Sequence, residues 1–203
     1  MRDVDFLCEL LESVACDGMK VLELGVEHGS SLFALAPIVK NHKGFILGVD
    51  KWANEEMYCK VITESFNDFR NVVELQRVDL FYFDQIIPDN HFDFIHFDAC
   101  YTWPEVKLMI QRYLPKAKKG ALICGHGADF YWGNIPEKER ETYTIYPNLI
   151  TVGLPPGSLP YTLSEMYNGG SPAIHLNLAR ALYELFNDDY ELNAPHAYWH
   201  RRV

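Results

Sequence analysis

Between positions 23 and 50 the chain carries residues whose types and spacing suit a nucleotide site: Glu23, Gly25, Gly29, Ser30 and Asp50. The glycines remove side chains where the backbone must turn sharply and where a ligand or helix comes close. Ser30 is a favourable N-cap, and the free amides behind it attract an anionic or electron-rich group. Asp50 stands near the spacing at which a nucleotide-binding βαβ unit puts an acid on ribose hydroxyls. The alternative is a merely structural βαβ turn.

The dinucleotide fingerprint G-x-G-x-x-G does not fit this stretch, because its first glycine would fall on Glu23 and its third on His28. This mismatch counts against a nicotinamide or flavin enzyme. An acid at position 23 would repel a pyrophosphate, but it suits a ligand that ends in a cationic amino acid and a sulfonium.

The elements that must position these residues alternate between strand and helix. Val21, Leu22 and Leu24 form the short apolar run of a parallel strand that is covered on both faces. We expect strands at 20–24, 45–49, 72–78, 92–97 and from Ala121 to Cys124, and helices at 4–16, from Ser30 or Ser31, up to Phe69, at 82–87 and at 104–114. This alternation predicts an α/β fold with a doubly wound, mostly parallel sheet in three layers.

Three successive strands are expected to end on acids, namely Asp50, Asp79 and Asp98. Ligands of such sheets bind at the carboxyl ends of the strands, near the switch in strand order. One acid at a strand end is ordinary turn chemistry, whereas three in succession indicate a ligand site.

Composition narrows the class of protein. The 203 residues, 48% of them hydrophobic, suffice for one substantial domain, so we expect a single domain over 1–203. The net charge of −10 disfavours a nucleic-acid partner and favours small molecules. The five cysteines form no C-x-x-C pair, no apolar run approaches the length of a membrane span, and the first residues do not resemble a signal peptide. These features predict a cytoplasmic protein that does not enter the membrane.

The pattern Glu23-x-Gly25-x-x-x-Gly29-Ser30 resembles the first motif of class I S-adenosylmethionine-dependent methyltransferases. Residues 92–130 are similar, at matching spacing, to a family of small-molecule or sugar O-methyltransferases. In that family a strand ends in Asp-Gly, a His-x-Tyr follows in the loop, and the next strand ends in Gly-His-Asp-Tyr. Residues 174–203 resemble its last helix and closing antiparallel hairpin, so the resemblance covers most of the chain.

The resemblance implies S-adenosylmethionine as cofactor and a Rossmann-like sheet. The residues that it assigns to the cofactor are Glu23, Gly25, Gly29, Ser30 and Ser31 around the methionine part, Asp50, Lys51 and Trp52 at the ribose and adenine, Asp79 and Leu80 at the adenine, and Asp98 with Ala99 near the amino group or reaction centre.

The chain departs from the family at catalytic positions. The loop histidine is replaced by Tyr101, whose ordinary pKa of about 10 makes it a poor base. In the Gly-His-Asp-Tyr motif, Gly127 and Ala128 stand as if inserted. His126 is the best candidate for the base, although packing against Tyr131 or Trp132 is an equal alternative.

A set of Asp98, His126 and Asp129 could instead hold a divalent metal, but we assign no metal ligands. Residues 130–172 lose all periodicity and contain many prolines, glycines and aromatics, which predicts a lid or acceptor-binding insertion.

The sequence therefore predicts an S-adenosylmethionine-dependent methyltransferase that acts on a hydroxyl of a small molecule, such as a sugar or secondary metabolite, with His126, Asp98 and Tyr101 as candidate catalytic residues. Two other hypotheses remain open: a cofactor-binding protein that has lost catalysis, and an α/β oxidoreductase. Neither the acceptor nor the oligomeric state can be read from the residues.

Overall fold

The computed structural model describes residues 3–100, 102–128, 131–138, 140 and 172–203. Its strands form one seven-stranded sheet of order β3-β2-β1-β4-β5-β7-β6. The strands are β1 (Lys20–Leu24), β2 (Phe45–Asp50), β3 (Val73–Arg77), β4 (Phe92–Phe97), β5 (Ala117–His126), β6 (Glu191–Asn193) and β7 (Tyr198–Arg202). The helices are α1 (Asp3–Glu12), α2 (Ser30–Asn41), α3 (Glu55–Phe69), α4 (Leu80–Phe83), α5 (Trp103–Tyr113) and α8 (Pro172–Phe186), with short 3-10 turns η1 (Leu114–Lys116), η2 (Trp132–Asn134) and η4 (Ala194–His196).

The sheet has the predicted doubly wound plan. Strands β1 to β5 pair in parallel, and β7 pairs antiparallel with both β5 and β6. The strand order reverses at β1, which lies between β2 and β4, so the carboxyl ends of β1 and β4 flank the switch point. The predicted Rossmann-like sheet with a C-terminal antiparallel hairpin is confirmed.

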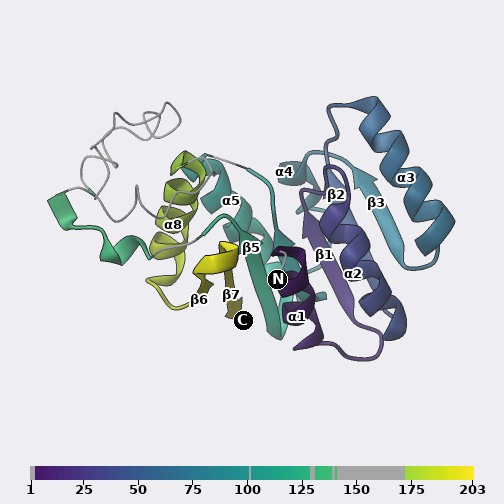
Figure 1. Cartoon of the computed structure of the whole chain (residues 1–203), viewed down its shortest axis with the longest axis horizontal. Helices are drawn as coiled ribbons and strands as arrows, with labels where there is room; N and C mark the ends of the chain where they lie inside the picture. Colours follow the sequence, from purple (N-terminus) through teal and green to yellow (C-terminus); the bar gives the residue numbers. More distant parts are fainter. Residues whose placement is uncertain (1–2, 101, 129–130, 139, 141–171) are drawn as a thin grey trace.

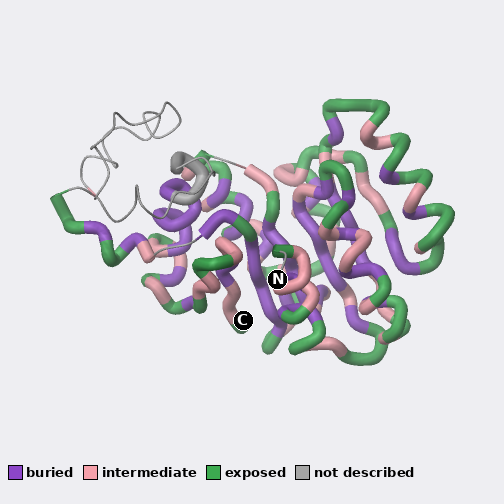
Figure 2. Tube along the Cα trace, viewed as in Figure 1, coloured by how far each residue is buried: buried purple, intermediate pink, exposed green. Residues whose placement is uncertain are grey.

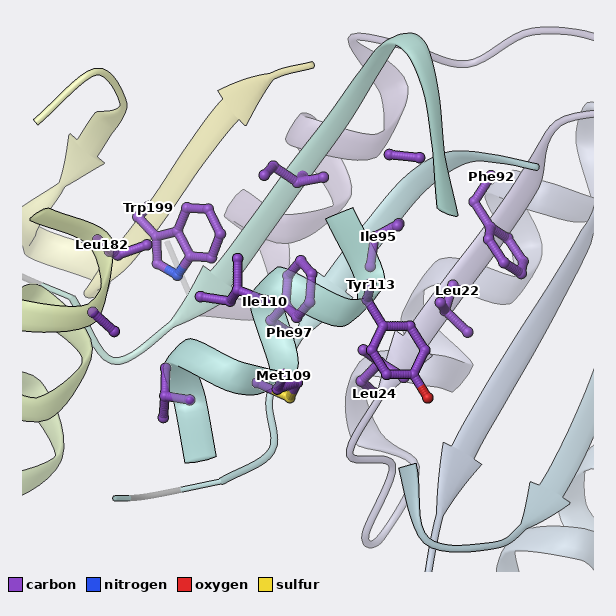
Figure 3. Packing of buried hydrophobic residues seen from close by; sticks show 14 of the residues in the cluster. Leu22, Leu24, Phe92, Ile95, Phe97, Met109, Ile110, Tyr113, Leu182 and Trp199 are labelled. Carbon is purple, nitrogen blue, oxygen red and sulfur yellow. The ribbon is translucent and has the colours of Figure 1, made fainter. Parts of the chain in front are cut away.

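Helices cover both faces of the sheet and make three layers (Figure 1). One apolar cluster joins α1, α2 and α3 to the first face and contains Leu11, Leu35 and Val61. A second joins α4, α5 and α8 to the opposite face, where Figure 3 shows Leu24, Phe97, Ile110 and Trp199 packed together. The strands at the middle of the sheet are buried along most of their length, while the outer face of α3 is exposed (Figure 2). The near-continuous apolar runs of the strands follow from this cover on both faces.

Trp199 anchors the closing hairpin to the second cluster. Its side chain is fully buried and its ring stacks near Phe97, with centroids 6.0 Å apart. Gly125 makes room for it, since a Cβ at that position would lie 2.6 Å from the indole Nε1. A side chain at position 125 would therefore push β7 away from β5.

Several expected boundaries were wrong. Helix α1 ends at Glu12 rather than 16, because the Ser13 hydroxyl donates back to the Leu10 carbonyl and the chain turns. The N-cap of α2 is Gly29, with φ +80°, and not Ser30. The short helix expected at 82–87 lies at Leu80–Phe83, where the Asp79 side chain accepts from the Phe81 amide.

Strand β5 was also placed too late in the sequence, since it begins at Ala117, before Gly120. Gly120 lies inside the strand with φ +84°. Of the insertion predicted at 130–172, only 131–138, 140 and 172 are described, and the rest lies outside the described residues. Within the described part, no helix is long and apolar enough to cross a membrane.

The first helix is held against the closing hairpin. The Phe6 ring stacks on His196 with centroids 5.5 Å apart and meets Tyr198 edge-on at 5.9 Å. The His196 Nδ1 lies 3.2 Å from a carboxylate oxygen of Asp3. Segments separated by almost the whole sequence therefore form one aromatic contact.

Candidate functional site

A cavity of about 540 Å³ opens at the carboxyl ends of β1, β2 and β4, at the switch point. It is lined by the turn after β1 and the start of α2 (Gly25, Val26, Glu27, His28, Ser30, Ser31), the end of β2 (Val49, Asp50, Lys51), the segment after β3 (Asp79, Leu80, Phe81) and the segment after β4 (Asp98, Ala99, Cys100, Thr102, Glu105).

Most of the residues that the sequence assigned to the cofactor line this cavity together: Gly25, Ser30, Ser31, Asp50, Lys51, Asp79, Leu80, Asp98 and Ala99. Glu23, Gly29 and Trp52 do not line it and lie behind its wall. Sequence reasoning missed the lining residues that follow recognised positions in the same loops, such as Phe81 after Leu80 and Cys100 after Ala99.

Gly25 is required by a close backbone approach. Its φ is +91°, and a Cβ there would lie 2.2 Å from the carbonyl oxygen of Asp98. Its amide donates to Val49 O at 2.9 Å, while the Asp98 amide donates to Leu24 O at 2.8 Å. The turn after β1 is thereby fixed against both neighbouring strands, which leaves bare backbone at the floor of the cavity.

Asp50 organises that same turn. Its Oδ2 accepts hydrogen bonds from the amides of Val26 and Glu27, both at 3.0 Å, and its Oδ1 accepts from the Trp52 amide at 2.7 Å. A carboxylate has about four acceptor positions, so these three bonds leave Asp50 one acceptor position, on Oδ1, for a ligand. Asp50, which was predicted to bind ribose, therefore also fixes the turn after β1 through its hydrogen bonds to backbone amides.

Trp52 supports the same turn from the side away from the cavity wall, through a hydrogen bond to Glu27. Its side chain is buried, and its indole Nε1 donates to the carbonyl of Glu27 at 2.9 Å. Its own carbonyl accepts from Arg77 Nη2 at 3.0 Å, and Arg77 also pairs with Glu55. The indole therefore holds the backbone of Glu27, which lines the cavity, while Trp52 itself does not line it.

Glu23 is fully buried beneath Ser31 and beside His96. Its Oε1 accepts a short hydrogen bond from the Ser31 hydroxyl and lies 3.1 Å from His96 Nδ1. Burial acts to lower the pKa of His96, but the hydrogen bond and negative charge of Glu23, together with Asp98, outweigh it and raise that pKa. His96 was not identified from the sequence, where it reads as one more residue of an apolar strand.

The two catalytic candidates that the structure describes, Asp98 and His126, do not both line the cavity. Asp98 lines the cavity, Tyr101 lies outside the described residues, and His126 is exposed at the end of β5. The His126 ring contacts Tyr198 edge-on, with centroids 5.2 Å apart, and His126 does not line the cavity. No group of three or more histidines, cysteines or acids among the described residues could hold a metal ion, and Asp129 lies outside them.

The cavity carries an excess of negative charge. Five acids line it, namely Glu27, Asp50, Asp79, Asp98 and Glu105, against the cation Lys51 and the titratable His28. Burial and the nearby Glu105 raise the pKa of the Cys100 thiol to about 11, so this residue presents no thiolate at neutral pH. The arrangement suits a ligand with positive charge and hydroxyl groups.

Three solved structures resemble the chain in fold. The O-methyltransferase from Bacillus cereus, solved in complex with SAH, aligns with TM-score 0.62 and 16% identity over 99% of this chain and 80% of its own. A proposed caffeoyl-CoA O-methyltransferase from Staphylococcus aureus aligns with TM-score 0.62 and 15% identity over 98% and 81%. A proposed rRNA methylase from Clostridium thermocellum aligns with TM-score 0.53 and 14% identity over 75% and 82%.

At such identities these structures show the fold alone, and no curated protein matches the sequence. The family described as "Methyltransferase domain" matches residues 22–128, which is more than half of the chain and includes every segment that lines the cavity. This match argues against the oxidoreductase alternative. The chain belongs to this methyltransferase family and is a class I S-adenosylmethionine-dependent methyltransferase.

Proposed function

We propose that this protein transfers a methyl group from S-adenosylmethionine to a hydroxyl of a small molecule, with the cavity at the ends of β1, β2 and β4 as its cofactor site. The observation that carries the proposal is the turn after β1, which Gly25 and Asp50 hold open as bare backbone beside an acidic wall. Two of the similar folds, from Bacillus cereus and Staphylococcus aureus, are described as O-methyltransferases.

The residues present fit the cofactor. A Cβ at Gly25 would collide with the Asp98 carbonyl, so the loops after β1 and β4 approach each other there without side chains between them. The acids suit the sulfonium and ammonium charges of the cofactor, whereas they would repel a pyrophosphate. In this proposal Gly25, Ser30 and Ser31 hold the amino-acid end, Asp50 and Lys51 the ribose, Asp79 and Leu80 the adenine, and Asp98 and Ala99 the region next to the methyl group.

Glu23, Gly29 and Trp52 then support the cofactor indirectly. Glu23 accepts from Ser31, and Trp52 holds the Glu27 carbonyl. Gly29 caps α2 in a left-handed conformation, and a Cβ there would lie 2.5 Å from the Phe33 ring. Each of them fixes backbone or a side chain that lines the cavity.

The bound cofactor supplies an activated methyl group, so the protein's main work is to hold the acceptor oxygen in line with it. An acceptor hydroxyl also needs a base or a metal to lower its pKa. His126 is the proposed base, at the carboxyl edge of the sheet, with Tyr101 as a further candidate and Asp98 as a positioning group beside the methyl.

The acceptor is proposed as a small molecule because a chain of net charge −10 with an acidic cavity repels phosphate backbones. We propose that residues 130–172 form a lid over the acceptor within one domain spanning 1–203. The five free cysteines suit the reducing cytoplasm, where we propose that the protein acts.

A second candidate is a protein that binds the cofactor without catalysis. The observation that favours it is His126, which does not line the cavity and instead contacts Tyr198. The amides of Gly127 and Ala128 both donate to the Ala197 carbonyl, at 2.7 and 2.9 Å. The two apparently inserted residues are thus engaged with the closing hairpin.

Calorimetry with S-adenosylhomocysteine and with reduced nicotinamides tests the proposal first. We expect S-adenosylhomocysteine to bind and to raise the melting temperature, as any ligand specific to the folded state must. A methylation screen over hydroxylated metabolites then separates the two candidates. Absence of S-adenosylhomocysteine binding would contradict both.

A further inference from the structure

A cluster of charged and aromatic side chains joins α5 to α8, which pack against each other (Figure 1). It consists of Trp103 and Lys107 on α5 with Arg180 and Glu184 on α8, and we call it the α5–α8 cluster. Arg180 is only 6% exposed. Arginine keeps its charge in proteins, and a buried charge costs several kcal/mol, by rough estimate, unless it is paired. The contacts of Arg180 therefore decide whether the cluster is complete.

The acid of the cluster is shared by two cations. Arg180 Nε donates to Glu184 Oε1 at 2.9 Å, and Lys107 Nζ donates to Glu184 Oε2 at 2.7 Å. Burial acts to raise the pKa of Glu184, but the hydrogen bonds and charges of Lys107 and Arg180 outweigh it and lower that pKa. Glu184 is therefore ionised, and the α5–α8 cluster keeps one positive charge in excess.

Two hydrogen-bond donors of the cluster lack an acceptor. Arg180 Nη1 and the indole Nε1 of Trp103 are both buried, and neither has a hydrogen-bond partner in the described part of the chain. The guanidinium lies over the indole, with Cζ 3.7 Å from the ring centroid, so the two donors are neighbours. Because the large majority of buried polar side-chain atoms in proteins are hydrogen-bonded, two unpaired donors in one place indicate a missing partner.

The chemistry of the two donors defines that partner. Neither an indole nor a guanidinium contains an acceptor, so the partner must supply lone pairs. The excess positive charge favours an anion, and a carboxylate offers two oxygens to neighbouring N–H donors. The cation–π contact holds the guanidinium against the indole before any ligand arrives. A single carboxylate therefore suits both donors and the unbalanced charge.

The cluster adjoins the cavity on the side away from the proposed ribose and adenine segments. Trp103 directly follows Thr102, which lines the cavity, although Trp103 and Arg180 do not line it themselves. The ribose and adenine segments follow β2 and β3, on one side of the switch point. Helix α8 lies on the other side, where the Phe186 ring packs near Trp199 of β7 with centroids 6.2 Å apart. This placement suits the acceptor and not the cofactor.

We propose that Arg180 and Trp103 bind a carboxylate of the methyl acceptor. The inference rests on the proposed function and narrows its acceptor from hydroxylated small molecules to hydroxy acids. The acidic excess of the cavity suits the cationic cofactor and repels a carboxylate. The α5–α8 cluster attracts one, so the two sites together orient the acceptor with its anionic end away from the cofactor.

The test compares hydroxy acids with their methyl esters, by calorimetry on the full chain saturated with S-adenosylhomocysteine. The panel is lactate, glycerate, glucuronate and salicylate, each beside its methyl ester, which keeps the hydroxyls and lacks the charge. We expect at least one acid to bind about 10- to 100-fold more tightly than its ester, the usual worth of a hydrogen bond to a charged group.

Two variants remove one donor each. Arg180→Gln, whose amide can still donate to Glu184, should abolish the preference for the acid. Trp103→Phe, which keeps an aromatic ring under the guanidinium but loses the N–H, should reduce the preference by about 10-fold. In both variants the affinities for the ester and for S-adenosylhomocysteine should stay unchanged. If Arg180→Gln does not fold, Trp103→Phe carries the comparison.

Arg201→Gln is the matched control, because Arg201 also combines an acid with an aromatic ring. Its Nη2 lies 2.9 Å from Asp189 Oδ2, and its Cζ lies 4.9 Å from the centroid of Phe186. Both of these partners belong to the end of α8 and the segment after it, away from Trp103. The variant should leave the preference for the acid unchanged.

Three results would overturn the inference while S-adenosylhomocysteine binding leaves the proposed function intact. The first is a wild-type chain that prefers no acid of the panel over its ester. The second is equal weakening of acid and ester by the variants, which would show a merely structural role for Arg180 and Trp103. The third is tighter binding of glycerol phosphate than of glycerate, which would assign the cluster to a phosphate. A chain that binds no S-adenosylhomocysteine would overturn the proposed function and this inference with it.

Discussion

Gly25 lies so close to Asp98 that a Cβ on the glycine would meet the Asp98 carbonyl oxygen at 2.2 Å. The contact joins the turn after β1 to the loop after β4, on the two sides of the switch point. Both loops line the cavity, so their spacing sets its width. No other residue type can occupy position 25 without moving one of them.

Gly25→Ala is therefore expected to destabilise the fold strongly. Alanine pays about 1 to 2 kcal/mol for the left-handed backbone, and the overlap with Asp98 adds a further ~1 to 3 kcal/mol. Gly120→Ala is the matched control, because its φ is also positive, at +84°, but nothing lies within 4 Å of its Cβ. Urea unfolding measures both, and equal losses would contradict the close approach.

Asp50→Asn should lower both stability and affinity for S-adenosylhomocysteine. The amide nitrogen cannot accept, so whichever way the side chain turns, the variant leaves either the Trp52 amide or both the Val26 and Glu27 amides without a partner, at about 1 to 3 kcal/mol. Asp68→Asn, which removes an equal charge from the exposed face of α3, serves as control. Affinity that survives in Asp50→Asn would show that the turn holds without this carboxylate.

His126→Ala is expected to cut turnover by about 10²- to 10⁴-fold, the usual contribution of a general base. Affinity for S-adenosylhomocysteine should stay nearly intact, since His126 does not line the cavity. Steady-state kinetics and calorimetry on the same preparation measure the two effects. Full activity in the variant would move the base to Tyr101 or to a metal-bound hydroxyl.

A metal role for Asp98 can be separated from a positioning role. If Asp98 and Asp129 ligate a divalent ion, a chelator should stop turnover and added magnesium should restore it. Turnover that ignores chelation would leave Asp98 as a positioning residue at the cavity wall.

The stability that His96 contributes should depend on pH. Burial lowers the pKa of His96, but Glu23 and Asp98 outweigh burial. In the folded protein they raise this pKa above its ordinary value of about 6.5. The contribution is then fully present below about pH 6.5 and is lost as pH rises through the folded pKa. The difference in unfolding free energy between wild type and His96→Gln should shrink over that range. A difference independent of pH would show a neutral imidazole throughout.

Local patterns predicted the strands and the strand-end acids because each depends on a few consecutive residues. The apolar run before Gly25 and the acid at Asp50 are examples, and both lie where they were expected. The hydrogen bonds of Asp50 were harder to predict, because the amides of Val26 and Glu27 that donate to it belong to the turn after β1, far from Asp50 in the sequence.

His96 shows why the rest of the site escaped prediction. Its partner Glu23 is brought beside it only by the strand order, in which β4 pairs with β1. The family resemblance assigned Trp52 to the cofactor, but the backbone at Trp52 is left-handed, with φ +36°, and the indole is buried behind the turn. Pairings of this kind depend on tertiary geometry that spacing alone does not contain.

The aromatic contact between α1 and the closing hairpin has a consequence for biosynthesis. During translation Phe6 emerges from the ribosome long before His196 and Tyr198, which complete its packing. Over that interval the helix lacks these partners, and the growing chain must stay competent to fold without them. Folding of the nascent protein should thus finish in a late step, when the hairpin that begins at Glu191 has left the exit tunnel.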